Sequence, residues 1–419
     1  MIVTAIELFT QMDVATFVYF FWFFVVFDAP RYVLSMVSVT IGAVLERSQS
    51  PMEYSGPVSV LLVGHNEGDS LTKCIRSLHE QSHKDLQIVI VDDGSTDNSI
   101  EVTNKLKQQG LVDIAITTGM RGGKASALNL GLNYCKHEIV VQMDIDTSLE
   151  RDAIEEIISP FSNPLTGAVS GNLTVRNAES NLLTRLQTIE YILSLSFGRR
   201  FTSMMGILTI VSGAFGAFRK SAIHSVGGWD VGPGDDGNLT NKMRRSGWRI
   251  YFAHRAWALT QVPDSLPAYT RQRLRWSRSI VRYKLRKFRS ALNPFSRNFS
   301  AYDAAAIFNI LFFQVGLTVS FFAYLAWLIY EMRSEAIYII LATNVLYIIE
   351  DTLSFTMACV LYRNRKPERL GIYLPAYSLF STYIARVVRL KAYYDELVFR
   401  RSYQDSFVPA KVQNVLERF

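Results

Sequence analysis

Residues 57–146 alternate short apolar runs with polar segments of helical period. Strands are predicted by four apolar runs: VSVLLVG (58–64), LQIVIVDD (86–93), VDIAITT (112–118) and EIVVQMDID (138–146). Helices are predicted at residues 70–82, at residues 97–109 and from Gly123 onward. Apolar strands that alternate with helices are typical of an open parallel sheet covered on both faces. The pattern therefore predicts an α/β domain of Rossmann-like type with a mostly parallel sheet.

The N-terminal region carries a long apolar segment. Residues 14–27 (VATFVYFFWFFVVF) are continuously apolar, and Asp28, Pro30 and Arg31 then interrupt before the apolar residues 32–45. No small-residue cleavage site follows, which disfavours a removed signal peptide. We expect the first run to be a transmembrane helix and the second to be a further span or an interfacial continuation.

The C-terminal region is apolar as well. Residues 304–330 are long enough to span a bilayer, and residues 336–362 predict a second span although Glu350 and Asp351 lie inside it. Acidic residues within a membrane usually face a protein interior or a water-filled path, so this pair indicates either a channel or a packing contact. Residues 370–385 predict a further crossing, or a re-entrant or interfacial helix because arginines and lysines follow at once.

Composition supports this division of the chain. Of 419 residues, 49% are hydrophobic and 19% are charged, and the mean hydropathy is +0.13. These values are too apolar for a soluble enzyme. We predict four parts: N-terminal transmembrane segments (1–50), a cytoplasmic domain (51–290), transmembrane or interfacial helices (291–390) and a basic tail (391–419).

The charge pattern indicates the orientation in the membrane. The net charge is +7, and the basic clusters RYKLRKFR (282–289) and RNRKPER (363–369) flank the apolar C-terminal region. Such clusters usually mark the cytoplasmic side, which predicts a multi-pass membrane protein with its middle domain in the cytoplasm. No nucleic-acid-binding module is recognisable. The three cysteines lack metal-ligand spacing, and their low number fits a reducing compartment.

Polar side chains follow three of the predicted strands. They are His65, Asn66 and Glu67 after the first, Asp92 and Asp93 after the second, and Asp144 and Asp146 at the end of the last. A strand that ends in Asp-Ile-Asp sends both carboxylates to one face. Alone, such a pair is equally well explained as a helix cap. Because ligands bind beyond the carboxyl ends of parallel strands, the convergence of three such ends predicts a site.

The chemistry of this edge suits a nucleoside diphosphate. Lys124 lies near a predicted helix start, where phosphate binds well. Carboxylate oxygens hold hard divalent cations, so we expect Mg2+ or Mn2+. The chain has neither GxxxxGK[ST] nor GxGxxG after the first strand, which excludes a P-loop enzyme and argues against a dinucleotide enzyme. A nucleotide-sugar transferase remains.

Six motifs follow one another in the order seen in a known family. They are VDDGSTD, GGKASALN, DID, SGAFGAFRKSA, GGWDVGPGDDGNLT and RQRLRW. From about residue 57 to residue 280, the sequence resembles the processive inverting family 2 glycosyltransferases of GT-A fold, which include hyaluronan, chitin, cellulose and poly-N-acetylglucosamine synthases. The ordered set is specific although each motif alone is weak.

The resemblance implies roles for residues on the donor side. Asp93 resembles the residue that recognises uridine, and Glu67 and Lys124 are expected to contact the donor. Asp144 and Asp146 resemble the DxD pair, in which Asp146 would chiefly hold the metal ion and Asp144 would serve both the metal and the nucleotide-sugar.

Further roles are implied for the reacting centre and the acceptor. Asp236 is similar to the catalytic base of the family. In RQRLRW, Gln272, Arg275 and Trp276 match the QxxRW signature; Arg275 would approach the diphosphate, and Trp276 with Gln272 would contact the acceptor. An acidic turn that caps a helix is the alternative reading of GDDGNLT, and core packing is the alternative for Trp276.

The implied function is polymerisation of a UDP-sugar into a β-linked polysaccharide that is extruded across the membrane. The segment GDDGNLTNKM is closer to hyaluronan and chitooligosaccharide synthases, whereas SGAFGAFRKSA is closer to poly-N-acetylglucosamine synthases. UDP-N-acetylglucosamine is therefore the first expectation for the donor and UDP-glucose the second. His65 departs from the family, which usually has tyrosine there. An export partner or a homo-oligomer is compatible with this function.

Two other functions stay open at this point. One is a non-processive transferase that adds a single sugar to a lipid carrier. The other is an inactive membrane scaffold of an export complex, which would not need the set Asp93, Asp146 and Asp236.

Two further segments carry expectations. Residues 181–205 predict an amphipathic helix with Arg185, Arg199 and Arg200 at its polar positions, placed either near the membrane and the acceptor path or on the plain surface. Residues 399–413 are basic and aromatic, which favours membrane-surface contact or packing beneath the catalytic domain.

Overall fold

The structure, a computed structural model, describes residues 10, 12–46, 53–232, 234–296, 299–362, 367–404 and 409. Its sheet has eight strands in the order β3-β2-β1-β4-β7-β6-β8-β5. The strands are β1 (Val58–Gly64), β2 (Leu86–Asp92), β3 (Ile114–Thr117), β4 (Ile139–Asp144), β5 (Ser148–Leu149), β6 (Thr166–Val175), β7 (Phe215–Arg219) and β8 (Arg249–Thr260).

The sheet is mixed rather than wholly parallel. β1 runs parallel to β2 and β4, and β2 runs parallel to β3, as the apolar pattern predicts. β7 is antiparallel to both β4 and β6, while β6 and β8 are parallel. The pattern of residues 57–146 cannot reveal β7, because this strand arrives from a distant part of the chain and inserts beside β4.

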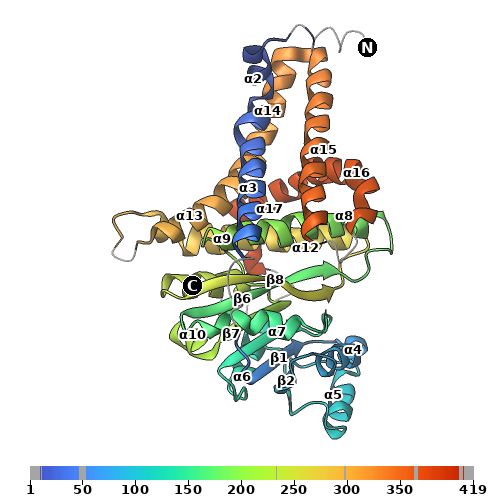
Figure 1. Cartoon of the computed structure of the whole chain (residues 1–419), viewed down its shortest axis with the longest axis vertical. Helices are drawn as coiled ribbons and strands as arrows, with labels where there is room; N and C mark the ends of the chain where they lie inside the picture. Colours follow the sequence, from blue (N-terminus) through green and yellow to red (C-terminus); the bar gives the residue numbers. More distant parts are fainter. Residues whose placement is uncertain are drawn as a thin grey trace.

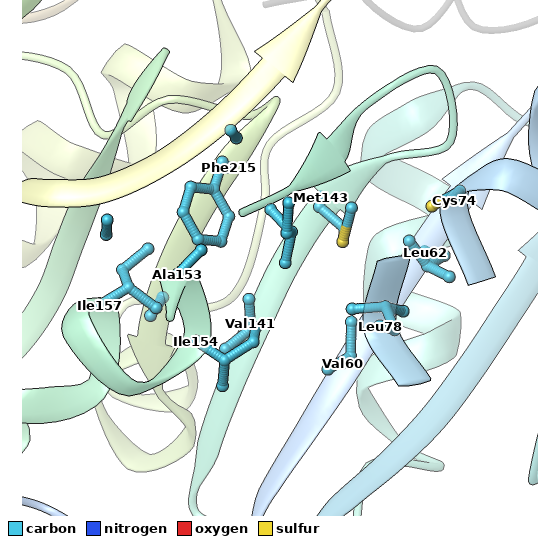
Figure 2. Packing of buried hydrophobic residues seen from close by; sticks show 14 of the residues in the cluster. Val60, Leu62, Cys74, Leu78, Val141, Met143, Ala153, Ile154, Ile157 and Phe215 are labelled. Carbon is cyan, nitrogen blue, oxygen red and sulfur yellow. The ribbon is translucent and has the colours of Figure 1, made fainter. Parts of the chain in front are cut away.

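Helices cover both faces of the sheet. The helices are α4 (Gly68–His79), α5 (Ser99–Gln108), α6 (Lys124–Leu132), α7 (Ala153–Ile158), α10 (Lys220–Ser225) and α11 (Asp235–Arg245). Val60 and Leu62 point to the face that α4 and α7 cover, as Figure 2 shows. Leu61 and Val63, which alternate with them along β1, pack in the cluster that α6, α10 and α11 share.

Between the sheet and a helical bundle lies a layer of two helical segments that run across the direction of the bundle helices; we call them the flat helices (Figure 1). One is formed by α8 (Leu182–Glu190), the π-helical η3 (Tyr191–Phe197) and α9 (Gly198–Met204); the other by α12 (Leu266–Ile280) and η4 (Val281–Lys287). Leu186 and Ile189 of α8 pack against Phe355 and Tyr377 of the bundle.

The predicted helix over residues 181–205 is therefore present, but the expectation that its arginines lie at polar positions fails at Arg200. The Arg200 side chain is buried, because the helix is covered on both sides rather than exposed on one. The alternative of a plain surface helix does not fit this covered position.

The N-terminal apolar runs form one helical stretch, because α2 (Val14–Phe23), η1 (Phe24–Asp28) and α3 (Ala29–Glu46) follow one another directly in the chain; the stretch is kinked at Phe21, where φ is −102° and ψ is 17°. The second run is thus a continuation of the first and not a separate span. Asp28 lies inside this helical stretch. Its side chain is buried and accepts a hydrogen bond of 2.6 Å from Tyr347 Oη. The π-helical turn η1 precedes Pro30, which cannot donate a backbone hydrogen bond.

The C-terminal apolar region forms a helical hairpin. Its parts are α13 (Ala301–Ile310), η6 (Leu311–Gly316), α14 (Leu317–Met332), η7 (Arg333–Glu335) and α15 (Ala336–Leu361). Within the described residues, two stretches are long and apolar enough to cross a membrane, Val14–Val44 and Ala301–Leu361. The second reverses direction at η7, so α14 and α15 stand side by side with the N-terminal helix (Figure 1).

Residues 367–404 lie at the base of the bundle. They form η9 (Pro367–Tyr373), α16 (Leu374–Leu379), η10 (Phe380–Ile384), α17 (Ala385–Phe399) and η11 (Arg401–Gln404). Here α17 packs along α12, and Arg278 of α12 forms an ion pair of 2.5 Å with Asp395. α17 thus packs against the helical layer that contains α12.

The first basic cluster serves the interior of the protein. Lys284 is buried and donates a hydrogen bond of 2.5 Å to Asn241 Oδ1, and Arg286 pairs with Glu396 at 2.6 Å. The second cluster lies partly outside the described residues, as does most of the tail after residue 404.

Candidate active site

The predicted strand ends do meet at one edge of the sheet. Gly64 at the end of β1 is in register with Asp92 of β2, and Val63 is in register with Asp144 of β4. His65 Nδ1 lies 3.0 Å from the carbonyl oxygen of Asp93. The convergence expected from the sequence is thereby confirmed as geometry.

Asp93 is bound to the glycine-rich loop that precedes α6. Its two carboxylate oxygens accept hydrogen bonds of 2.7 Å from the backbone N–H groups of Gly122 and Gly123, and the side chain is buried. Gly94 makes this approach possible, since its φ is +68° and a Cβ there would lie 2.6 Å from the Arg121 nitrogen. Asp93 therefore fixes the loop that positions Lys124, in addition to any contact that it makes with a nucleobase.

Lys124 and Asp144 form the central ion pair of the site. Lys124 Nζ lies 2.6 Å from Asp144 Oδ1 and 3.4 Å from the carbonyl oxygen of Gly213. Burial alone would lower the pKa of Lys124, but the carboxylates of Asp144, Asp236 and Asp235 outweigh it and raise the pKa. The lysine thus stays charged next to the position expected for the diphosphate.

Asp146 does not belong to the strand. β4 ends at Asp144, and Asp146 lies in the turn before β5. Strand alternation is therefore the wrong reason for placing the two carboxylates together, although the turn still brings them close. Burial and the charge of Asp144 raise the pKa of Asp146. Burial, followed by Asp146 and Asp144, raises the pKa of Glu67 to about 7.

This set of acids fits a divalent cation. Glu67, Asp144 and Asp146 repel one another, and the positive charges of Lys124 and Arg176 offset this repulsion only in part, so a further cation would relieve it. In the described part of the chain, no three His, Cys, Asp or Glu side chains gather closely enough to hold a metal alone. A two-carboxylate donor set leaves positions free for phosphate oxygens, as hard cations with nucleotide ligands require.

Asp236 lies in the first turn of α11, on the other side of Gly213. Gly234 caps this helix in the left-handed region with φ +85°. Gly213 N–H donates a hydrogen bond of 3.0 Å to Asp236 Oδ2. Burial, then the neighbouring Asp235, raises the pKa of Asp236 to about 7. A carboxyl group with such a pKa is suited to accept a proton near neutral pH.

Trp276, Gln272 and Arg275 all lie on α12. Ser279, one turn further on, donates a hydrogen bond of 2.7 Å to the carbonyl oxygen of Trp276. A Cβ on Gly234 would lie 2.9 Å from the Ser279 Cβ, so this helix packs against the turn that carries Asp236. Trp276 remains 37% exposed, and Gln272 Oε1 is buried without a hydrogen-bond partner among the described residues.

Three residues of the site carry no role in the sequence motifs. Gly213 contributes both its N–H to Asp236 and its carbonyl to Lys124, and Gln142 Nε2 also donates to that carbonyl at 3.1 Å. Tyr283 packs against Gly234 and Gly237. The motif SGAFGAFRKSA contains Gly213, but its letters give no sign that one backbone unit joins a lysine to an acid.

Comparisons with known proteins agree with this geometry. Residues 59–227 match the family described as Glycosyl transferase family 2. The poly-beta-1,6-N-acetyl-D-glucosamine synthase of Staphylococcus epidermidis is 32% identical over 240 residues, which cover 56% of this chain and 57% of the relative. The synthase of that name from Staphylococcus aureus (strain MSSA476) is 32% identical over 237 residues, with the same coverage. The matched region thus spans little more than half the length of these relatives.

A solved structure shares the fold. A mannosyltransferase from Pyrobaculum calidifontis, in complex with GDP-Man and Mn2+, superimposes with a TM-score of 0.61 at 18% identity, over 87% of this chain and 99% of that one. The chain therefore contains a family 2 glycosyltransferase domain of GT-A fold and resembles the poly-β-1,6-N-acetyl-D-glucosamine synthases.

Proposed function

We propose that the chain is an inverting, processive glycosyltransferase that adds sugars from a UDP-sugar to a β-linked polysaccharide. The observation that carries this proposal is the placement of Asp236. Its carboxylate is held by Gly213, whose carbonyl contacts Lys124, the partner of Asp144. One backbone unit thus links a base with raised pKa to the donor-side ion pair.

The reaction follows from these positions. Asp236 takes the proton from an acceptor hydroxyl as that oxygen attacks the anomeric carbon of the donor sugar. The bond between the anomeric carbon and the diphosphate breaks, and its electron pair leaves with UDP. Direct displacement inverts an α-linked donor to a β-linked product. Lys124 and Arg275 would stabilise the charge that develops on the leaving diphosphate.

Asp146 and Asp144 would hold Mg2+ or Mn2+, and the ion would act as a Lewis acid on the diphosphate. Asp93, which fixes the loop before Lys124, would contact uridine, and Glu67 would border the donor site. The acceptor would stack on Trp276 beside Gln272.

UDP-N-acetylglucosamine is the proposed donor, with UDP-glucose second. Support comes from the relatives at 32% identity, which are named poly-beta-1,6-N-acetyl-D-glucosamine synthases. The chain spans part of their length, so the donor and the polymer are carried over as a proposal.

We place three helices, namely the N-terminal helix (α2 to α3), α14 and α15, in a bacterial-type inner membrane, with the catalytic domain in the cytoplasm. Apolar side chains are exposed along all three, as a lipid surface requires. They include Val33, Leu34, Val37, Val319, Ile329, Ile337, Val345 and Leu353.

Most of the bundle interior is aromatic and aliphatic, but a small group of buried polar side chains lies on α15, and we take this group as support for extrusion of the product along it. Glu350 and Ser354 lie one turn apart on α15, and both side chains are buried. Neither Glu350 oxygen nor Ser354 Oγ has a hydrogen-bond partner among the described residues. A hydroxyl-rich sugar chain would satisfy such groups. An export partner or a second copy would act on the far side.

The test is a donor screen on purified protein in detergent with Mg2+ or Mn2+. UDP release would be followed from UDP-N-acetylglucosamine, UDP-glucose, UDP-glucuronate and UDP-galactose, and the product would be digested with linkage-specific hydrolases. We expect release with one donor, dependent on the divalent ion, and a polymeric product.

Other results would replace the proposal. A product that carries a single sugar on a lipid would establish the non-processive alternative. Unchanged polymer formation by Asp236→Asn, in cells that lack any other synthase, would contradict the assigned base and favour the scaffold alternative.

A further inference from the structure

The indole of Trp276 is covered on one face by an arginine. The Cζ atom of Arg273 lies 4.5 Å from the centroid of the Trp276 ring, and it also lies 5.0 Å from the centroid of the Tyr269 ring. A guanidinium this close to an aromatic ring makes a favourable cation–π contact. The ring of Trp276 is thus held from one side while 37% of the residue remains exposed.

Arg273 is itself fixed to another element. Its Nη2 atom forms an ion pair of 2.8 Å with Glu190 Oε2, and the two side chains are 12% and 25% exposed. Glu190 is the last residue of α8, so the pair joins the two flat helices beneath the bundle. Because Glu190 holds one end of the guanidinium, Arg273 is already ordered over the Trp276 ring before an acceptor binds. Binding then does not have to order the Arg273 side chain.

The other arginines of α12 have different surroundings. Arg278 pairs with Asp395 of α17, and Arg271 is exposed to solvent. Among the described arginines of this helix, Arg273 is the one placed over the Trp276 ring. Arg273 occupies the first x of the QxxRW pattern, a position at which the pattern specifies no residue.

We infer that Arg273, held by Glu190, is a positioning residue that orients the Trp276 ring so that its free face meets the acceptor sugar. This inference rests on the proposed function, since it needs a saccharide acceptor at Trp276. Arg273 acts through the indole and not on the reacting atoms. It therefore sets how well the acceptor is bound and leaves donor binding and bond cleavage unchanged.

The experiment uses the full chain in detergent with Arg273→Lys. Lysine keeps the charge and reaches toward Glu190, but it lacks the planar group that stacks on the indole. We expect the KM for an added β-1,6-linked N-acetylglucosamine oligosaccharide acceptor to rise about tenfold. UDP release from the donor to water, measured without acceptor, should keep its rate. Arg271→Lys is the matched control on the same helix and should change neither quantity.

A double-mutant cycle separates positioning from general damage. If Arg273 acts through Trp276, then Arg273→Lys has no further effect on acceptor KM in a Trp276→Ala background. Glu190→Gln should raise acceptor KM in the same direction as Arg273→Lys, because it releases the guanidinium. Thermal unfolding of each variant checks that the protein is folded.

Three outcomes are distinguished. A wild-type protein that elongates no saccharide contradicts the proposed function. A wild-type protein that elongates the acceptor, with an unchanged KM in folded Arg273→Lys, overturns the positioning inference alone. Equal loss of elongation and of UDP release to water would assign Arg273 a structural role and also overturn it.

Discussion

Asp236 owes its chemistry to residues that surround it from several elements. The charged and titratable groups that affect it or are affected by it are Asp235, Lys124, Asp144, Arg199 and Tyr283. Burial is the leading cause of its raised pKa, and Asp235 follows. Two adjacent carboxylates in one buried helical turn cannot both ionise easily, which is the condition under which one stays available as a proton acceptor near pH 7.

We predict that kcat/KM rises with pH, reaches half of its maximum near pH 7 and levels off above that, because Asp236 must be ionised to act and has a pKa of about 7. Asp235→Asn removes the neighbouring charge and should shift this profile to lower pH. A pH–rate series of UDP release measures both. A profile for Asp235→Asn that does not move would contradict the coupling.

The raised pKa of Asp236 also makes the free energy of unfolding depend on pH. The folded state binds the Asp236 proton more tightly than the unfolded chain, whose value is near 3.8. The corresponding contribution to folding is present below the unfolded pKa and is lost as the pH rises through about 7. The protein thus gives up stability in the range where the base becomes active.

Gly213 offers a second test at the residue scale. A Cβ at this position would lie 2.7 Å from Asp236 Cγ and closer still to both carboxylate oxygens, so Gly213→Ala must displace the Asp236 side chain. We expect kcat to fall by about 100-fold or more. Gly119→Ala is the matched control, since nothing lies within 4 Å of its Cβ. Full activity of folded Gly213→Ala would show that the Asp236 position is not needed.

At the scale of elements, α11 is attached to the end of the helical bundle that lies nearest the sheet. Arg244 of α11 forms a buried ion pair of 2.5 Å with Asp303 of α13, with side-chain exposures of 8% and 3%. Arg244 also donates to the carbonyl oxygen of Leu208 and to Asn241 Oδ1, both at 2.7 Å. Helix α11, which carries Asp236 in its first turn, is thus attached through Arg244, near its last turn, to α13.

We predict that Asp303→Ala lowers the free energy of unfolding by about 3–5 kcal/mol, because it leaves Arg244 buried without its carboxylate. The control is Glu179→Ala, which removes the exposed partner of Arg185. That change should cost about 1 kcal/mol or less. Thermal unfolding in detergent compares the two. Equal effects would show that the Arg244 pair is not structurally important.

The sequence anticipated some elements and not others, for physical reasons. The apolar runs of β1 and β4 are buried on both faces, so their pattern is strong enough to predict the strands and the acids that follow. The sequence predicts a strand through Asp146, because two acids spaced by two residues look alike in a strand and in a turn. Gly213 stayed unseen because its function resides in its backbone, and the burial of Arg200 depends on α3 and β8, which are distant in sequence.

At the scale of the whole molecule, the arrangement of helices makes a topological prediction. The turn η7 and the start of α2 lie at one end of the bundle, and the sheet lies at the other (Figure 1). In intact cells, Ser334→Cys should react with a membrane-impermeant thiol reagent, whereas Ser180→Cys in the catalytic domain should be protected. Both positions are exposed in the structure. Labelling of Ser180→Cys alone would reverse the proposed orientation.

The flat layer of α8 and α12 fixes the height of the site below the bundle. In the proposed synthesis, each addition then begins from the same place, whatever the length already made. The site would therefore not sense the number of sugars already added. Termination would compete with addition at a constant ratio, and chain lengths would follow a single-exponential distribution whose mean reports that ratio.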